Sequence, residues 1–256
     1  MKVDVVLLTK NSVSRNAPGV FERSLKSILN NVPVDKLIIV DGFSNDGTLD
    51  LIHRFFNNVE VIRTCALRGK AREIGIKHVE TPYFMFVDDD VILCKDWFKK
   101  ATKYLNEDVG AVWGLNFDIT PSIKNRYYLR LLEITARGCF NIRGGMHDIL
   151  ILHESVKDIK IPKELHAYED AYIINWIKKK GYKVVIGEDI YCLHRKPPHS
   201  YALREGIRSA MSEVKYGLAL LHLYTYSLYY TLLTSSWFFH FLSVFKNAHL
   251  NKKSKR

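Results

Sequence analysis

The sequence is poor in cysteine, and its cysteines do not form motifs. Cys65, Cys94, Cys139 and Cys192 are separated by long, irregular gaps, and no two of them make a CxxC pair. Zinc knuckles and disulfide frameworks need closely and regularly spaced cysteines, so neither is expected here. The chain is expected to fold in a reducing compartment.

Acidic residues are also scarce relative to basic ones. The 256 residues include 38 Lys and Arg but only 27 Asp and Glu, which gives a formal net charge of +11. Such an excess indicates an anionic partner, either nucleic acid, a phosphorylated small molecule or anionic lipid, without choosing among them. There is no internal repeat, and the basic tail Lys252–Arg256 is the one low-complexity tract.

A secretory signal is not evident at the N-terminus. The apolar run in MKVDVVLLTK is short, and no cleavage-site pattern follows it. The catalytic part is therefore expected to stay in the cytosol. Hydrophobic residues make up 47% of the chain, enough for one large α/β domain with a buried core.

Strand-like and helix-like segments alternate through the first half of the chain. Short apolar runs predict strands, and apolar residues every three or four positions predict helices. The strand-like segments are Val3–Leu8, Lys36–Val40, Val59–Arg63, Tyr83–Val87 and Gly110–Leu115, and the helix-like ones are Gly19–Leu29, Thr48–Phe56, Arg68–Val79 and Asp96–Leu105. This alternation predicts a mostly parallel sheet covered by helices on both faces.

The pattern of helices and strands is less regular in the second half of the chain. Asp118–Lys163 gives no clear pattern, whereas Glu169–Lys180 is helical, and Lys183–Ile186 and Ile190–Leu193 are strand-like. In open parallel sheets, ligands bind beyond the carboxyl ends of the strands. Chemistry is therefore expected just after Leu8, Val40 and Val87.

Acidic residues follow two of these strands. Asp88, Asp89 and Asp90 come directly after a buried strand, and carboxylates one residue apart suit a hard divalent cation such as Mg²⁺ or Mn²⁺. The alternative is a solvated acidic turn. Asp41–Thr48 (DGFSNDGT) is a weaker signal, because Asp, Asn, Ser and Gly are ordinary turn and cap residues.

Three further features offer polar chemistry. Lys70 and Arg72 open a predicted helix, where they are placed to hold phosphate oxygens unless they are a solvated basic turn. Glu169 and Asp170 open another helix and suit either capping or general-base chemistry. His194 follows a strand and suits a metal, a phosphate or a purely structural contact.

Taken together and in this order, these segments resemble the family 2 glycosyltransferases of the GT-A fold, from about Val3 to His194. The resemblance implies a Rossmann-like, mostly parallel sheet flanked by helices. It also implies that Asp170 is the catalytic base and that Asp90 and His194 bind Mn²⁺ or Mg²⁺. The residues that it implies for donor binding are Thr9, Asn11, Asp41, Lys70, Arg72, Asp88 and Glu169.

The activity implied is that of an inverting, metal-dependent hexosyltransferase. Its donor would be GDP-mannose or a UDP-hexose, and its acceptor a hydroxyl of a lipid-linked molecule or glycan. Two departures bear on this. Glu73 stands where the family usually has Asn, and Glu205–Ser209 (EGIRS) lacks the Gln and Trp of the QxxRW motif in processive members, which favours transfer of a single sugar.

Rival functions remain open. The first is a polyprenyl-phosphate sugar synthase with the same fold. The second is a nucleotidyltransferase, although such enzymes usually carry a glycine-rich loop after the first strand and Thr9–Ser14 has no glycine. A nucleic-acid partner is not expected, because the basic residues are spread along the chain and no recognition motif appears.

The C-terminal part is expected to associate with a membrane. We expect a catalytic domain at residues 1–198, an amphipathic interfacial helix at 199–216, and a hydrophobic segment with a basic tail at 217–256. Leu218–Phe245 contains no Asp, Glu, Lys or Arg and is long enough to span a bilayer or lie in its plane. Its basic flanks favour the cytoplasmic face of the cell membrane. The alternative is a buried helix in a homodimer interface.

Overall fold

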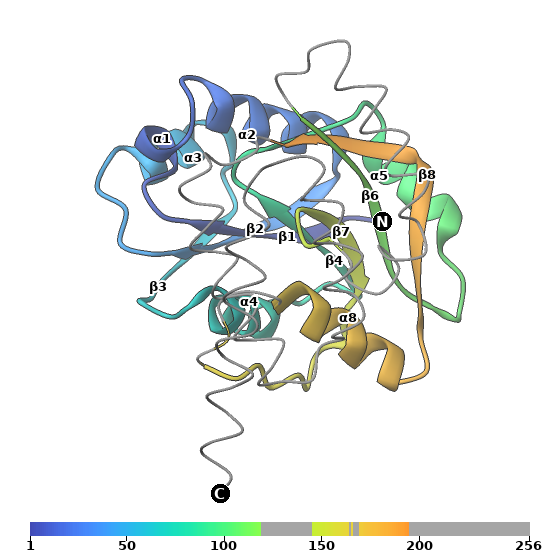
Figure 1. Ribbon diagram of the computed structural model, residues 1–256. Helices are drawn as coiled ribbons and strands as arrows, with labels where there is room; N and C mark the ends of the chain where they lie inside the picture. The colour runs from blue at the N-terminus through green and yellow to red at the C-terminus, as the bar shows by residue number, and fades with distance from the viewer. Residues whose placement is uncertain (119–144, 164, 166–168, 195–256) are drawn as a thin grey trace, which may run out of the picture.

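The computed structural model describes residues 1–118, 145–163, 165 and 169–194, and every structural statement below refers to these. Their strands form one eight-stranded sheet in the order β3-β2-β1-β4-β7-β6-β8-β5 (Figure 1). The strands are β1 (Val3–Thr9), β2 (Val34–Asp41), β3 (Val59–Arg63), β4 (Tyr83–Asp88), β5 (Val91–Leu93), β6 (Val109–Asp118), β7 (Asp148–Leu152) and β8 (Lys183–His194).

The sheet is mostly parallel, as predicted. Strand β1 pairs in parallel with β2 and β4, β2 pairs in parallel with β3, and β6 with β8, whereas β7 and β5 run antiparallel to their neighbours. In this register Thr9 lies opposite Asp41, and Leu8 lies opposite Asp88. The carboxyl ends of β1, β2 and β4 therefore meet at one edge of the sheet, which we call the carboxyl edge.

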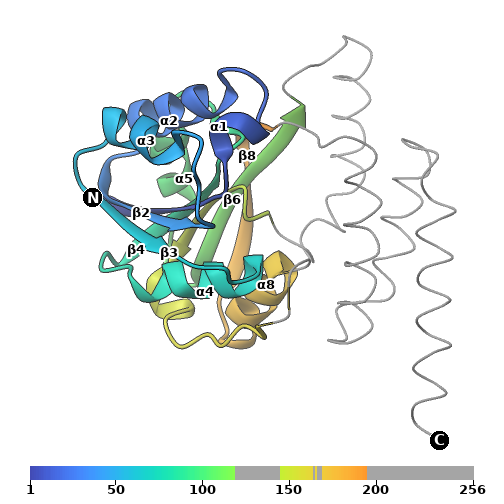
Figure 2. The same ribbon diagram turned by 90° about the vertical axis from the view of Figure 1, so that its left-hand side faces the viewer.

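Helices cover both faces of the sheet. Helices α2 and α3 lie on one face, and α4 and α8 on the other (Figure 2). The helix bounds are α1 (Ser12–Arg15), α2 (Val20–Asn31), α3 (Thr48–Phe55), α4 (Arg68–Lys77), α5 (Trp97–Ala101) and α8 (Glu169–Lys179), with short 3₁₀ turns at Thr102–Tyr104 and His153–Ser155.

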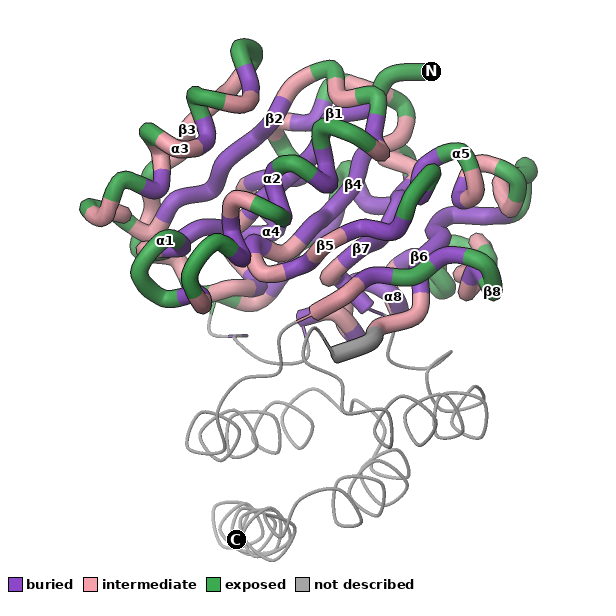
Figure 3. The backbone as a smooth tube through the Cα atoms, turned by 90° about the horizontal axis from the view of Figure 1, so that it is seen from above, coloured by how far each residue is buried: buried purple, intermediate pink, exposed green. Residues whose placement is uncertain are grey.

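Alternation along the strands builds two cores. Leu7 packs with Leu25 of α2 and Ile52 of α3, whereas its neighbour Val6 packs with Ile76 of α4 on the opposite face. This is the period of two expected of a strand that is buried on both sides. The central strands are buried along most of their length (Figure 3).

The structure adds elements that the sequence pattern did not predict. Strand β7 lies in the segment that gave no clear pattern. Strand β5 has three residues and directly follows Asp88, Asp89 and Asp90, which we call the aspartate turn. The two strand-like pieces near the end of the domain form one continuous strand, β8. Helix α5 is shorter than predicted, since it gives way to a 3₁₀ turn at Thr102.

The predicted segments 199–216 and 217–256 lie outside the described residues, and their membrane association stays a prediction. Within the part of the chain that is described, no helix has the length and apolar character needed to cross a membrane.

Candidate active site

Asp41 ties together the ends of the first two strands. It is the last residue of β2, is fully buried, and accepts hydrogen bonds from Thr9 Oγ1 (2.8 Å) and from the backbone N–H of Ser44 (2.8 Å). The guanidinium of Arg63 lies 4.0 Å from the same carboxylate. Asp41 and Thr9, both predicted to bind the donor, are therefore in direct contact.

Asn11 links the loop after β1 to the loop after β2. It lies in the left-handed region (φ 51°), donates its backbone N–H to Ser44 Oγ (2.8 Å), and accepts the N–H of Asn45 on its side-chain oxygen (3.0 Å). Short polar side chains tolerate this backbone conformation better than others. Thr9, Asn11 and Asp41 thus belong to one hydrogen-bonded pair of loops at the carboxyl edge.

The three aspartates after β4 point to three different partners. Asp88 accepts a hydrogen bond from Arg72 (3.1 Å), and Asp90 faces His194. Asp89 is buried against Ser12 and Arg15, and burial raises its pKa to about 6 despite the arginine. Only the first and third aspartates therefore face the part of the edge where a donor is expected, and the second joins the turn to α1.

His194 is held between two strands and the aspartate turn. Its Nε2 lies 3.2 Å from Asp90 Oδ1, and its Nδ1 lies 3.0 Å from the side-chain nitrogen of Asn116. Burial alone would lower the pKa of His194, but the hydrogen bond and charge of Asp90 raise it. Folding has brought together two residues that lie far apart in the sequence and were both predicted to bind metal.

The Asp90–His194 pair fits a small divalent cation. Two ligands at adjacent positions on Mg²⁺ or Mn²⁺ are separated by about 3 Å, since each bond is about 2.1 Å long. The pair has that spacing, and both side chains are about a quarter exposed at the carboxyl edge. Carboxylate oxygen suits Mg²⁺ and Mn²⁺, and neutral imidazole is a common metal ligand.

Arg72 joins the aspartate turn to the start of α8. Its side chain is 3% exposed, with Nη2 3.1 Å from Asp88 and Nε 3.3 Å from Glu169, and it stacks on the Phe86 ring at 4.9 Å. Burial tends to raise the pKa of Asp88, but the Arg72 charge lowers it overall. Arg72 thus fixes two predicted donor-site carboxylates, and its predicted phosphate contact stays a prediction.

Glu73, where the sequence departs from the family pattern, has a structural role. It is buried and accepts hydrogen bonds from Lys70 Nζ (2.6 Å), Lys77 Nζ (2.7 Å) and the backbone N–H of Ile161 (2.8 Å). The carboxylate therefore fixes α4 to the segment before α8. Lys70 is paired with Glu73 in this structure, and its predicted phosphate contact stays a prediction.

Gly69 allows the same two segments to approach closely. Its N–H donates to the carbonyl of Leu165 (3.1 Å), and a Cβ at this position would lie 2.5 Å from that oxygen. The glycine is therefore required by the contact between the start of α4 and the chain that leads into α8.

Asp170 lies in the first turn of α8, next to the buried Glu169. Its Oδ1 accepts the backbone N–H of Ala171 (2.8 Å). Acidic side chains are favoured in the first turn of a helix by the helix dipole. Because Glu169 pairs with Arg72, and Arg72 with Asp88, Asp170 is connected through two ion pairs to the aspartate turn.

Sequence reasoning missed a second polar group beneath this edge. His147, Asp148 and Cys192 place ligand atoms within 4.8 Å of one another, and no other group of this kind occurs among the described residues. Their positions next to apolar strand residues resemble ordinary strand flanks, so no sequence signal identified them. Trp97 donates to Asp148 from α5 (2.9 Å).

A mostly parallel sheet with an aspartate turn and a Glu-Asp helix start at its carboxyl edge is the arrangement expected of a GT-A fold. The chain belongs to glycosyl transferase family 2, whose family model matches residues 4–154. It is similar to the poly(ribitol-phosphate) β-N-acetylglucosaminyltransferase TarS of Staphylococcus aureus, with 25% identity over 120 residues. That match covers 42% of this chain and 19% of TarS.

Solved structures agree on the fold. The mannosyltransferase PcManGT from Pyrobaculum calidifontis, in complex with GDP-Man and Mn²⁺, has a TM-score of 0.63 at 18% identity, covering 87% of this chain and 66% of PcManGT. Glucosyl-3-phosphoglycerate synthase from Mycobacterium tuberculosis, with Mn²⁺ and UDP, has a TM-score of 0.57 at 16% identity, covering 85% and 81%. The chain spans 39% of the TarS chain in its crystal structure.

Proposed function

We propose that the protein transfers one hexose from a nucleoside diphosphate sugar to an acceptor hydroxyl, with inversion at the anomeric carbon. The observation that carries the proposal is Arg72, which pairs at once with Asp88 of the aspartate turn and Glu169 beside Asp170. The predicted donor side and the predicted catalytic base are thus joined through one buried side chain.

The donor side is assigned to the hydrogen-bonded loops and the aspartate turn. Asp41 and Thr9 lie side by side at the ends of β2 and β1, with Asp88 in register on β4. We propose that these side chains receive the base and ribose of the donor. The Mn²⁺ or Mg²⁺ complexes of PcManGT and glucosyl-3-phosphoglycerate synthase support a nucleoside diphosphate as the ligand class.

The diphosphate is assigned to Asp90 and His194. When bound there, Mn²⁺ or Mg²⁺ supplies positive charge that offsets the negative charge developing on the leaving diphosphate. Asp90 provides the hard oxygen ligand, and Asn116 restrains the imidazole of His194 so that Nε2 faces Asp90. These two side chains would therefore hold the cation beside the aspartate turn, where its charge would attract the diphosphate.

Asp170 is assigned as the base that takes the proton from the acceptor hydroxyl. A hydroxyl must lose its proton as its oxygen attacks, so a carboxylate within hydrogen-bonding reach speeds the step. A polyprenyl phosphate is already anionic at neutral pH and needs no such base. The requirement for Asp170 therefore separates a hydroxyl acceptor from the alternative polyprenyl-phosphate sugar synthase.

We further propose that the acceptor is lipid-linked or a glycan and that the enzyme works at the cytoplasmic face of a membrane. The support is the sequence alone: an uncharged apolar segment, Leu218–Phe245, with basic residues on both sides. A homodimer through the same segment is the competing proposal. Flotation of the full chain with lipid vesicles, compared with a chain ending at residue 198, distinguishes membrane binding from dimerisation.

The proposed activity is tested by donor hydrolysis and transfer. The full chain is incubated with Mn²⁺ and either GDP-mannose or a UDP-hexose, and release of GDP or UDP is measured with and without membrane lipid extract. We expect release from one donor class, with dependence on Mn²⁺ or Mg²⁺ and on Asp90. Release of pyrophosphate from a nucleoside triphosphate would instead favour nucleotidyl transfer.

A further inference from the structure

Two histidines lie side by side beneath the carboxyl edge, and each is held by its own carboxylate. The rings of His147 and His194 have centroids 5.7 Å apart and an interplanar angle of 39°. Asp90 lies 3.2 Å from His194, and Asp148 lies 2.5 Å from His147. The first pair is partly exposed at the edge, and the second is more deeply buried.

We propose that His147 is a positioning residue of the donor site, fixed by Asp148 and Trp97, which sets the position of His194 and of the aspartate turn. This inference rests on the proposed function of the Asp90–His194 pair. It assigns a role to a residue group outside the family signature segments, and it requires no contact between His147 and the substrate.

Asp148 is held rigidly enough to fix His147. Its side chain is fully buried, and its Oδ2 accepts the indole N–H of Trp97 at 2.9 Å. Its Oδ1 has no hydrogen bond of its own but lies 2.5 Å from His147 Nδ1, so the two side chains are in direct contact. The buried carboxylate charge therefore restrains the imidazole by contact and by electrostatic attraction.

The ring of His147 has little freedom to turn. A Cβ on Gly145 would lie 2.5 Å from its Nε2, and the Trp113 ring packs edge-on at a centroid distance of 6.1 Å. On the other side, Cys192 Sγ lies 3.4 Å from Nδ1. A Cβ on Gly114 would lie 2.4 Å from Asp148 Oδ2, so the carboxylate is packed as closely as the ring.

His147 reaches the donor site in two ways. Its backbone carbonyl accepts the N–H of Asp88 at 3.0 Å, which fixes the residue at which β4 ends and the aspartate turn begins. Its ring packs beside that of His194, which faces Asp90. Loss of a group that orients a metal ligand typically weakens metal binding by about 10- to 100-fold when that group is hydrogen-bonded to the ligand. His194 has such a partner in Asn116, and His147 adds a restraint through ring packing.

A second metal ion in the lower group fits less well than this role. Two ligand atoms on one ion lie about 3 Å apart, given bonds of about 2.0–2.3 Å. The 2.5 Å separation between His147 Nδ1 and Asp148 Oδ1 is shorter than that, so the two atoms do not have the spacing of two ligands on one ion. Cys192 is fully buried, and burial raises the pKa of its thiol well above the usual value, which disfavours the thiolate that a metal needs.

The test is Mn²⁺ affinity in three full-length variants. Asp148→Asn keeps an acceptor oxygen for Trp97 and removes the carboxylate charge beside His147. Trp97→Phe removes the indole N–H together with part of the buried ring, and His147→Phe keeps a ring but loses the nitrogen that faces Asp148. Mn²⁺ is titrated calorimetrically into protein saturated with UDP or GDP, whichever the wild type binds.

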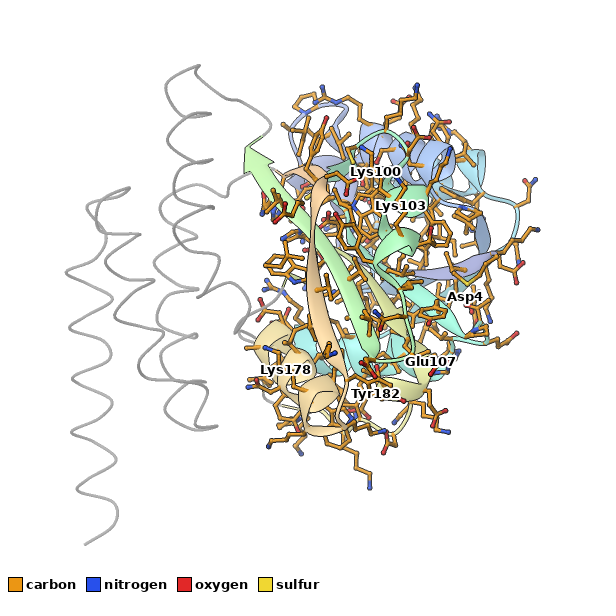
Figure 4. All side chains as sticks on the ribbon, turned by 90° about the vertical axis from the view of Figure 1, so that its right-hand side faces the viewer. Asp4, Lys100, Lys103, Glu107, Lys178 and Tyr182 are labelled. Atoms are coloured by element: carbon orange, nitrogen blue, oxygen red, sulfur yellow. The ribbon has the colours of Figure 1, made fainter. Side chains whose placement is uncertain are left out.

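We expect the Mn²⁺ dissociation constant to rise about 10-fold or more in Asp148→Asn and His147→Phe, and less in Trp97→Phe. We also expect kcat at saturating Mn²⁺ to change less than the Mn²⁺ dependence does. The matched control is Asp4→Asn, which alters a buried carboxylate near the amino end of β1 (Figure 4). This control should lower the melting temperature and leave Mn²⁺ affinity unchanged.

Unchanged Mn²⁺ affinity in folded Asp148→Asn and His147→Phe, with only a lower melting temperature, would overturn the inference. Asp90→Ala separates this failure from failure of the proposed function. If Asp90→Ala abolishes Mn²⁺ binding while Asp148→Asn and His147→Phe leave it unchanged, only the positioning role is wrong. If Asp90→Ala binds Mn²⁺ normally, the proposed cation site itself is wrong, and the inference fails with it.

Discussion

The guanidinium of Arg72 donates to the carboxylate of Asp88 at 3.1 Å. This contact crosses from the start of α4 to the end of β4, and the same guanidinium continues to Glu169 at the start of α8. One buried cation therefore sets the distance between the aspartate turn and the helix that carries Asp170. The proposed reaction needs that distance, because donor and base must act on opposite sides of one anomeric carbon.

Removing the Arg72 charge should destabilise the fold. Arg72→Met leaves the buried Glu169 without its closest cation, and breaking a buried ion pair costs about 3 kcal/mol or more. Urea denaturation measures the loss. Adding Glu169→Gln to the variant should recover part of it, because the buried carboxylate, which among the described residues then pairs only with Arg68 at 3.9 Å, loses its charge. A loss below about 1 kcal/mol in Arg72→Met would show that the pair is not the structural link inferred here.

Asp170→Asn should retain donor binding and lose turnover. The amide cannot accept the acceptor proton, and general-base catalysis contributes about 10²–10⁴-fold. Calorimetry measures donor binding, and product formation measures kcat. The matched control is Asp158→Asn, which alters an exposed carboxylate paired with Lys180 and should leave kcat unchanged. Wild-type turnover on a hydroxyl acceptor would remove Asp170 from its role, and wild-type turnover on polyprenyl phosphate alone would reverse the acceptor assignment.

Asp46 should make the fold sensitive to acid. Burial tends to raise its pKa, but hydrogen bonds from Thr48 and Ser14 lower it from 3.8 to about 2. Because the folded pKa is depressed, this stabilisation is present above about pH 4 and is lost as the pH falls towards 2. Asp46→Asn should cost about 1 kcal/mol at neutral pH and flatten the acid dependence of stability.

Thermal denaturation between pH 7 and pH 2 measures that dependence. The control is Asp50→Asn on the exposed side of α3 in the same region of the chain. A variant at Asp46 that follows the wild-type acid curve would show that the loop hydrogen bonds do not hold this carboxylate in its ionised form.

Gly69→Ala should disturb the approach of α4 to the chain before α8. The new Cβ would lie 2.5 Å from the Leu165 carbonyl and 2.9 Å from a methyl of Ile161. Overpacking of this kind costs about 1–3 kcal/mol. Replacing glycine by alanine in a helix gains about 1 kcal/mol of helix propensity, so the upper part of the overpacking range gives a net loss of stability. The free energy of unfolding, measured by chemical denaturation, should fall. The value of kcat should fall as well, since α8 carries Asp170. Unchanged stability and kcat would show that the segment adapts.

Much of the sheet is predictable from the sequence because buried parallel strands leave a plain pattern. β1, β2, β3 and β4 are all rich in apolar and β-branched residues and lie between helical segments, and the observed strands match the predicted ones to within two residues at either end. β7 escapes this reasoning. Its antiparallel pairing to β4 depends on contacts distant in sequence, which no local period reveals.

The places of the candidate site residues at strand and helix ends are predictable from the sequence, whereas their pairings are not, and their roles stay predictions. The aspartate turn, the Glu-Asp helix start and His194 follow from their places at strand and helix ends. Sequence spacing does not show that Arg72 is buried between two carboxylates or that Glu73 fastens α4. Nor does it show that Phe43 is half exposed at a positive φ of 60°, because that backbone conformation normally favours glycine. These features arise only when segments distant in the chain pack together.

The most direct test of the central claim is a crystal structure of the full chain with Mn²⁺ and the nucleoside diphosphate that it binds, using anomalous scattering to locate manganese. We predict an anomalous peak within bonding distance of Asp90 and His194, with the diphosphate on the metal and the nucleoside against Asp41. A peak at the His147–Asp148–Cys192 group instead, or a nucleotide bound away from the carboxyl edge, would contradict the account.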